Sequence, residues 1–212
     1  PCTEYNREAG RRLGRLEDRR CVNLKIMVET SARHIHVTQQ DLETLFGKDY
    51  KLTPKKDLSQ PGQFACVEKV EVVGPKSSLK LSILGPVRSE TQVELAKTDA
   101  RAIGIDAPLR MSGDLAGTPG CRVIGPKGEI EIDHGVIVAK RHAHFTPEQA
   151  QDYGVTDGQA IGIKLEYNGR SLIFGDVIAR VSKTAGLAVH IDTDEANAAG
   201  LTGTVDGEVV TF

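Results

Sequence analysis

Short segments in which apolar and polar residues alternate dominate the chain from about residue 23 onward. Side chains on a β-strand point alternately to opposite faces, so this pattern predicts half-buried strands. Gly-Pro pairs follow several of the segments and mark turns. Many short strands with few, short helices favour a barrel or a sandwich over a parallel α/β sheet. The clearest strands are predicted at residues 69–73, 79–83, 129–132 and 160–165.

An imperfect repeat relates the two halves of the chain. Residues 32–38 (ARHIHVT) are echoed by residues 140–146 (KRHAHFT). Each copy places a His-x-His pair before a threonine suited to cap a helix, namely Thr38 and Thr146. In the second copy Gln149 stands at the capping-box position. The repeat therefore predicts two related halves, each with a strand, a His-x-His pair and a capped helix.

We therefore expect a mainly β fold with short α-helices, built as two small β-barrel domains related by the repeat, with helices capping the barrels. The first domain is predicted over residues 22–138 and the second over residues 139–212, with approximate boundaries and exchange of chain between the barrels allowed. Residues 1–21 differ, because charged residues alternate there around a thin apolar stripe at helical spacing. This leader is interpreted either as a solvated terminus or as a short amphipathic docking helix.

Composition narrows the class of partner. The net charge is −2, from 27 basic and 29 acidic residues, which gives no global attraction to nucleic acid or to an anionic membrane. Aromatic residues make up only 4% and tryptophan is absent, which disfavours base stacking. No apolar run reaches the roughly 18 residues that a membrane span needs. Four widely separated cysteines suit neither a thiolate zinc site nor a disulfide scaffold, so a reduced cytoplasmic setting is expected.

The six histidines carry the candidate chemistry. Four of them form the pairs His34/His36 and His142/His144. Residues two apart on a strand face the same side, so each pair presents two imidazoles together, which suits zinc or a related divalent ion. One pair alone could be a surface feature or a satisfied core feature. Two pairs in matching contexts are hard to explain by packing.

Two further segments join the candidate site. His190 stands just before a predicted helix, whose free N–H groups and partial positive charge suit phosphate. In residues 88–94, alternation puts Arg88, Glu90, Gln92 and Glu94 on one strand face, and the functional interpretation offers a guanidinium to phosphate and a carboxylate to a metal. The alternative is an exposed polar face. Six extended residues span about 20 Å, so both can serve one site only if the backbone bends. His134, in a predicted turn, is interpreted as structural or superficial.

These motifs together resemble one family. The family is that of the PduL-type phosphotransacylases, also called phosphate propanoyltransferases, which these motifs resemble. The similarity covers about residues 24–200 and is carried by long stretches of sequence. The stretches are SARHIH from residue 31, KDLSQPGQF from residue 56, ILGPVRSETQVE from residue 83, SGD from residue 112, RHAH from residue 141 and HIDTDEANA from residue 190.

The resemblance implies a pair of β-barrel domains with two divalent metal ions, usually zinc, between them. Phosphate would be bound by Arg88, which is the candidate catalytic residue. The implied reaction interconverts propanoyl-CoA or acetyl-CoA plus phosphate with acyl phosphate plus coenzyme A. The implied metal ligands are His34, His36 and Glu94 for one ion, close to the coenzyme A thiol, and His142, His144 and His190 for the other.

The resemblance also implies a setting. Such enzymes often work inside bacterial microcompartments, for example those for propanediol degradation, and residues 1–21 would dock on shell or core proteins. The expected small-molecule partners are acyl-CoA, coenzyme A and phosphate, and the oligomeric state, including a homo-oligomer, is left open. Metal-assisted direct acyl transfer is expected, because no Ser-His-Asp or Cys-His arrangement is visible in the sequence.

Two other functions remain as alternatives. A cupin-like or hydrolytic metalloenzyme on a β-barrel would use a single metal and would leave the second His-x-His pair unexplained. A non-catalytic module with structural zinc would more often use four protein ligands, including cysteine, whereas three His or Glu ligands per ion favour open catalytic positions. The number of metal ions per chain separates these interpretations.

Overall fold

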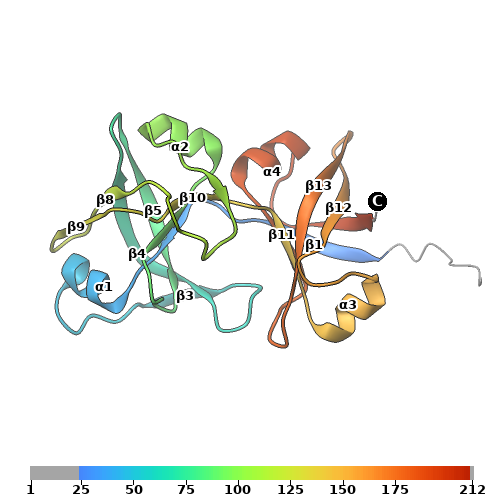
Figure 1. The fold of residues 1–212 in the computed structure, drawn as a ribbon, viewed down its shortest axis with the longest axis horizontal. Coiled ribbons are helices and arrows are strands. Elements are labelled where there is room, and N and C mark those ends of the chain that lie inside the picture. The colour runs from blue at the N-terminus through green and yellow to red at the C-terminus, as the bar shows by residue number, and fades with distance from the viewer. Residues whose placement is uncertain (1–23, 211–212) are drawn as a thin grey trace, which may run out of the picture.

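The computed structural model describes residues 24–210, which form two β units side by side with four short helices around them (Figure 1). The predicted leader, residues 1–21, lies outside the described residues. The prediction of a mainly β fold with few short helices is confirmed.

The C-terminal unit is a closed six-stranded barrel in the order β1-β14-β11-β13-β12-β15. Its strands are β1 (Lys25–Thr30), β11 (His142–Phe145), β12 (Ala160–Tyr167), β13 (Arg170–Val181), β14 (Ala188–Ile191) and β15 (Val205–Val210). Strand β1 pairs in parallel with β14 and antiparallel with β15. The first strand of the described chain therefore completes a barrel whose other strands all come after residue 141. Closure leaves no unpaired strand edge.

The N-terminal unit is a nine-stranded curled sheet in the order β7-β10-β6-β2-β5-β4-β8-β9, with β3 paired to β4. Its strands are β2 (His34–His36), β3 (Pro54–Asp57), β4 (Phe64–Val73), β5 (Ser78–Gly85), β6 (Gln92–Glu94), β7 (Leu109–Arg110), β8 (Cys121–Ile124), β9 (Glu129–Ile132) and β10 (Val136–Ala139). Unlike the C-terminal barrel, this sheet runs from β7 to β9 without closing. All four strands named from the alternation lie within β4, β5, β9 and β12.

Three of the four helices within residues 24–210 start at side-chain caps, of which those at Thr38 and Thr146 are named from the sequence. The helices are α1 (Gln39–Phe46), α2 (Lys97–Ile103), α3 (Pro147–Tyr153) and α4 (Thr193–Ala199). The hydroxyl of Thr38 caps α1, Thr146 and Gln149 form the capping box of α3, and Asp192 begins α4 with another capping box. Each cap satisfies backbone N–H groups that the first helical turn leaves free.

Helix α2 is capped from the other half of the molecule. Its own N-cap residue is Ala96, which has no side-chain acceptor. The backbone N–H of Thr98 instead donates to Asp194 Oδ2 in α4 at 2.8 Å. Helices α2 and α4 lie side by side where the two units meet (Figure 1). This contact links the two units through the helices that follow β6 and β14.

A loop contact joins the units on the side of Gln60. The amide of Gln60 donates to the carbonyl of Gly186 at 2.8 Å and accepts from its N–H at 3.2 Å. A Cβ atom at position 186 would lie 2.1 Å from the carbonyl oxygen of Ser59, so only glycine fits this approach. The loop that contains Ser59 is thus held against the C-terminal barrel.

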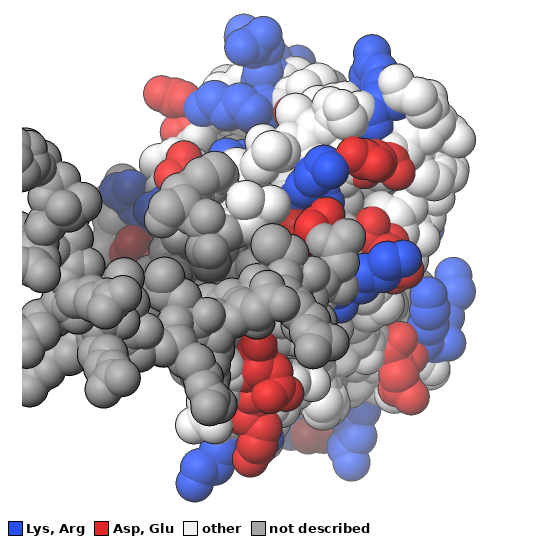
Figure 2. Space-filling view, turned by 90° about the vertical axis from the view of Figure 1, so that its right-hand side faces the viewer, with Lys and Arg blue, Asp and Glu red and all other residues white. Residues whose placement is uncertain are grey.

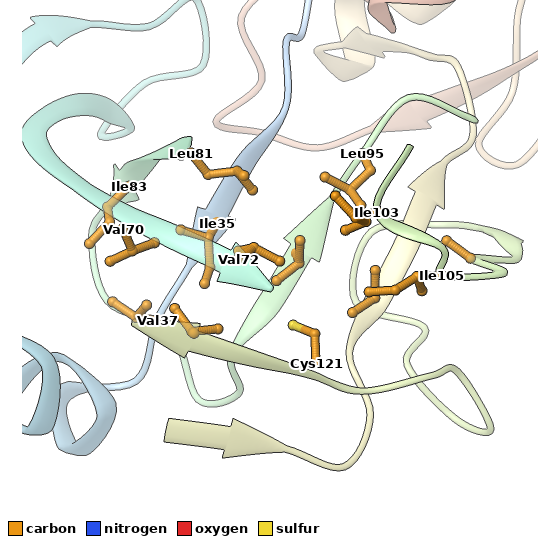
Figure 3. Close-up of a cluster of buried hydrophobic side chains, with 14 of the residues drawn as sticks. Ile35, Val37, Val70, Val72, Leu81, Ile83, Leu95, Ile103, Ile105 and Cys121 are labelled. Atoms are coloured by element: carbon orange, nitrogen blue, oxygen red, sulfur yellow. The ribbon is translucent and has the colours of Figure 1, made fainter. Parts of the chain in front are cut away.

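Each unit buries its own hydrophobic core. Figure 3 shows part of the N-terminal core, in which Ile35 and Ile83 point toward the other apolar side chains. Because Ile35 is buried between His34 and His36, both histidines turn to the opposite face of β2. Ala143 is buried in the core of the barrel in the same way, so His142 and His144 turn to the opposite face of β11. Core burial therefore orients both His-x-His pairs.

One face of the C-terminal unit carries charges of both signs (Figure 2). On the face shown in Figure 2, the described acidic and basic side chains are interspersed among uncharged ones. No helix within residues 24–210 is long and apolar enough to cross a membrane.

Candidate metal centre and active-site cavity

The first group of candidate ligands lies on two antiparallel strands, β2 and β6. Their register places His34 opposite Glu94 and His36 opposite Gln92. His34 Nε2 lies 3.5 Å from Glu94 Oε2, and the ligand atoms of His34, His36 and Glu94 all lie within 4.8 Å of one another. We call these three residues the first triad.

Hydrogen bonds orient each member of the first triad. His34 Nδ1 lies 2.9 Å from the carbonyl oxygen of Ala32, and His36 Nδ1 lies 3.2 Å from that of Leu84. A carbonyl can only accept, so Nδ1 carries the hydrogen and Nε2 is left to bind a cation. The Ser112 hydroxyl donates to Glu94 Oε1 at 2.9 Å, which fixes the carboxylate.

Burial and charge tune the first triad toward binding a cation. Burial lowers the pKa of His36 to about 3, helped by the charges of His34 and Arg88. Burial alone would raise the pKa of Glu94, but the charge of His34 holds it well below its usual range. Burial likewise opposes protonation of His34, yet Glu94 raises the pKa of that imidazole. The buried carboxylate of Glu94, beside two imidazole nitrogens, offers a charge that a divalent ion can neutralise.

The second group lies on β11 and β14, where His142 stands opposite His190. The ring centroids of His142, His144 and His190 are 4.8–5.1 Å apart, and their ligand atoms lie within 4.8 Å of one another. His142 Nδ1 lies 2.8 Å from the carbonyl oxygen of Lys140. Burial is the largest cause that lowers the pKa of His142 to about 4 and of His144 to about 3. His142, His144 and His190 form the second triad, and their imidazole nitrogens suit a divalent ion.

A carboxylate and a hydroxyl accompany the second triad. Glu29 on β1 stands opposite His190, and its Oε1 lies 2.7 Å from His190 Nε2. The Ser59 hydroxyl donates to Glu29 and lies 3.2 Å from the same ring nitrogen. The hydrogen bond between Glu29 and His190 is the main cause that lowers the pKa of Glu29.

This Ser-His-Glu contact was not predicted from the sequence. Ser59 lies 131 residues before His190 in the chain, and Glu29 lies 161 residues before it. The contact does not have the geometry of a nucleophilic triad. Such a triad needs the serine and the acid on opposite nitrogens of the imidazole, so that one positions the ring while the other is activated. Here Ser59 and Glu29 both approach Nε2.

Arg88 reaches the site because the chain before β6 is not a strand. Residues 86–91 are irregular, with bends at Ser89 and Glu90. The prediction of alternation across residues 88–94 is therefore wrong for its first part: Glu90 is exposed beside His134. Because the backbone bends between Arg88 and Glu94, both residues can reach one site, as an extended segment would not allow. Arg88 Nη1 donates to Ser112 Oγ at 3.3 Å. Burial lowers the pKa of Arg88.

One cavity of about 430 Å³ between the units brings the predicted residues together. It is lined by all seven: His34, His36, Arg88, Glu94, His142, His144 and His190. It is also lined by residues that no sequence pattern indicated, among them Glu29 and Arg180. Ser59 and Ser112 also line it and lie in motifs that carry the family resemblance, but nothing in the sequence assigns either of them a contact. Both triads fit divalent metal ions in donor type and spacing, and hydrogen bonds orient His34, His36, Glu94 and His142 among their members.

The protein thus combines a mainly β fold with one cavity between its two units, lined by two candidate metal-ligand groups and a half-buried arginine. A sequence model of the phosphate propanoyltransferase family matches residues 27–202. The chain therefore belongs to the phosphate propanoyltransferase family, a family of acyltransferases, and the prediction of an enzyme of this class is confirmed.

Individual relatives are similar over most of their length. A phosphate propanoyltransferase of Thermotoga maritima is 52% identical over 177 residues, covering 83% of this chain and 84% of the relative. One from Salmonella typhimurium is 51% identical over 176 residues, covering 82% and 83%. One from Sebaldella termitidis is 50% identical over 188 residues, covering 87% and 88%.

Proposed function

We propose that the protein transfers a short acyl group between coenzyme A and inorganic phosphate. Propanoyl-CoA or acetyl-CoA plus phosphate would be interconverted with the acyl phosphate plus coenzyme A. The observation that carries this proposal is the meeting of two triads and Arg88 in one cavity. Its volume, about 430 Å³, lies in the range of small-molecule sites. The relatives are named phosphate propanoyltransferase, which points to phosphate and a propanoyl group for those proteins.

We propose that the first triad holds one divalent ion and the second triad another, with zinc as the expected metal. When bound, such ions supply Lewis-acid polarisation of the thioester carbonyl and stabilisation of the leaving thiolate. The Nδ1 hydrogen bonds of His34, His36 and His142 to backbone carbonyls keep Nε2 aimed at the ligand position.

Arg88 is assigned the binding and orientation of phosphate. A guanidinium presents parallel N–H donors that match two phosphate oxygens, and its partial burial strengthens that interaction. Ser112 links this arginine to the first triad, because its hydroxyl accepts from Arg88 and donates to Glu94. Phosphate held by Arg88 would therefore sit in a fixed position relative to the thioester.

The transfer is proposed to be direct. A phosphate oxygen attacks the carbonyl carbon, the C–O bond forms, the C–S bond breaks, and the thiolate leaves with coenzyme A. Burial raises the pKa of Cys66 to about 11 and of Cys121 to about 12, and neither thiol lines the cavity. Ser59 and Glu29 both approach Nε2 of His190, so Glu29 does not hold that ring from its other nitrogen as a base for Ser59. Trapping of a radiolabelled acyl group on the protein would contradict direct transfer.

The proposed function is tested by thiol release from acetyl-CoA and propanoyl-CoA, with and without phosphate, before and after chelation. Release that needs both phosphate and metal is expected. Release without phosphate would indicate a thioesterase instead. No release from protein that retains metal would favour the hydrolytic or cupin-like alternative, and one ion per chain rather than two would support that outcome.

We further propose that the enzyme works in the cytoplasm inside a bacterial microcompartment, with residues 1–21 as the docking segment. This rests on the family resemblance and on the apolar stripe in that segment. A fusion of residues 1–21 to a fluorescent protein should gather in the compartments of shell-forming cells. Diffuse fluorescence would contradict the assignment.

A further inference from the structure

Arg180 lies on the face of the C-terminal barrel that carries the second triad. It belongs to β13 and stands opposite His144 in the parallel pairing with β11. The preceding residue, Ala179, is fully buried in the barrel core, so Arg180 projects from the opposite side of the strand. Its side chain lines the same cavity as Arg88.

The internal repeat does not require an arginine at this position. In the N-terminal unit, β5 pairs with β2 as β13 pairs with β11, with Ile83 opposite Ile35. Continuing that register by one residue brings Leu84 to the place of Arg180, and the Leu84 carbonyl indeed lies 3.2 Å from His36 Nδ1. The same architecture is thus built with an apolar side chain in one unit, which indicates that Arg180 has a purpose other than packing.

Arg180 also lacks the partners that neighbouring arginines have. Arg33 and Arg141, each just before a His-x-His pair, form ion pairs with acidic side chains at 2.9 Å and 2.6 Å. Arg180 forms no ion pair or side-chain hydrogen bond with any residue between 24 and 210. Arg88 contacts a hydroxyl but no carboxylate. Two guanidinium groups therefore face one cavity without acidic partners among the described residues.

The two guanidinium groups are close enough to affect each other. Burial lowers the pKa of Arg88, and the charge of Arg180 adds to that effect against the opposing charge of Glu94. Like charges in a shared, partly desolvated cavity repel, and a dianion between them removes that repulsion. A phosphoryl group has enough oxygens to accept paired N–H donors from both arginines.

We propose that Arg180 is a second phosphate-binding residue, which clamps the phosphoryl group together with Arg88, one arginine from each unit. This rests on the proposed function and assigns to it a two-sided subsite for phosphate and acyl phosphate. The phosphates of coenzyme A are a different source of the same chemistry, and the experiment separates the two.

The experiment compares Arg180→Gln and Arg180→Lys with a matched control, Arg122→Gln. Arg122 is exposed on β8 and pairs with Glu129 at 3.4 Å, away from the cavity. The KM for phosphate and the KM for acetyl-CoA are measured separately, with metal content and Tm. Inorganic phosphate is also titrated in a thermal-shift assay, which reports binding without turnover.

Arg180→Gln should raise the KM for phosphate at least about 10-fold, the scale expected for losing charge-assisted hydrogen bonds. The KM for acetyl-CoA should change less than about 3-fold, and the rise in Tm caused by phosphate should shrink. Arg180→Lys, which keeps the charge but loses the fork of donors, should fall between Arg180→Gln and the wild type. Arg122→Gln should match the wild type.

An unchanged KM for phosphate in Arg180→Gln would overturn the assignment, as would a rise confined to the KM for acetyl-CoA, which would place the coenzyme A phosphates there. If Arg180→Gln fails to fold, the KM for phosphate and the KM for acetyl-CoA measured for Arg180→Lys test the assignment instead. Failure of the proposed function is distinct, because wild-type protein would then release no thiol in a phosphate-dependent manner. The thermal-shift comparison still tests the anion site in that case.

Discussion

The two triads occupy equivalent places in the two units but differ in composition. In each unit a His-x-His strand pairs antiparallel with a short strand that supplies the third residue, Glu94 or His190. Each third residue precedes a helix N-cap by two positions, at Ala96 and Asp192. The repeat therefore conserves the geometry of the ligands while exchanging a carboxylate for an imidazole.

The difference in charge and burial separates the roles of the two sites. His34, His36 and Glu94 are 5%, 2% and 8% exposed, whereas His144 and His190 are only half-buried. Glu94 would place a carboxylate directly on the first ion, whereas the carboxylate beside the second triad, Glu29, contacts His190 and does not belong to the ligand group itself. We therefore expect the first site to bind metal more tightly and the second to remain the stronger electrophile.

Removing one ligand from each triad should have the largest effect. His34→Ala and His142→Ala should each lose about one metal equivalent and reduce turnover by more than the roughly 10–100-fold typical of changes around a metal's ligands. Elemental analysis and the thiol-release assay measure both quantities. His134→Ala is the control, because His134 is exposed beside Asp133 and Glu90. Full metal content in either ligand variant would contradict the assignment of its triad.

Converting the first triad into a copy of the second tests the charge difference directly. Glu94→His should retain metal at reduced affinity and lower turnover by about 10–100-fold, because the carboxylate and its Ser112 hydrogen bond are lost. Chelator titration with metal analysis gives the affinity of each site. Wild-type activity in Glu94→His would show that the exchange of a carboxylate for an imidazole between the triads does not affect turnover.

The supporting hydrogen bonds should have intermediate effects. Ser112→Ala frees Glu94 and Arg88, and Glu29→Gln weakens the contact with His190, so each should reduce kcat/KM by about 10-fold. Ser78→Ala is the matched control, since it removes a serine-to-glutamate hydrogen bond, to Glu71, far from the cavity. Equal loss in Ser78→Ala would mean that general destabilisation explains the result.

The cap that crosses between the units should have the smallest effect on chemistry. Asp194→Ala should lower the free energy of unfolding by about 1 kcal/mol, as the loss of a helix cap does. Asp194→Asn, which keeps an acceptor oxygen, should stay near the wild type. Urea denaturation measures the change, with Thr146→Ala as a cap within one unit. A larger loss for Asp194→Ala than for Thr146→Ala would show that the contact also holds the units together.

Local patterns were enough to single out most of the candidate residues that the structure brings together in the cavity. The His-x-His repeat, the caps at Thr38 and Thr146 and the alternating strands depend on neighbours in sequence, and the structure contains them. The contacts of Glu29 and Arg180 could not be predicted in this way. They depend on which strands pair and in which register, and such pairing joins segments far apart in the chain.

The alternation over residues 88–94 shows the opposite error. Residues 92–94 form a strand, but the preceding six residues do not, because the chain turns from the end of β5 into β6. Periodicity alone does not reveal where a strand begins. The family resemblance identified Arg88 and Glu94 without needing that geometry.

The position of β1 has a consequence for how the protein acquires its structure. A ribosome makes β1 before the whole N-terminal sheet, yet both strands that pair with β1 are made last. The barrel cannot close until β15 has emerged, so β1 must wait without partners while about 175 residues are added, at a rate of roughly 5–20 residues per second. Contacts between such distant segments also slow folding after release. Synthesis of the N-terminal half alone should yield a strand with no sheet to join.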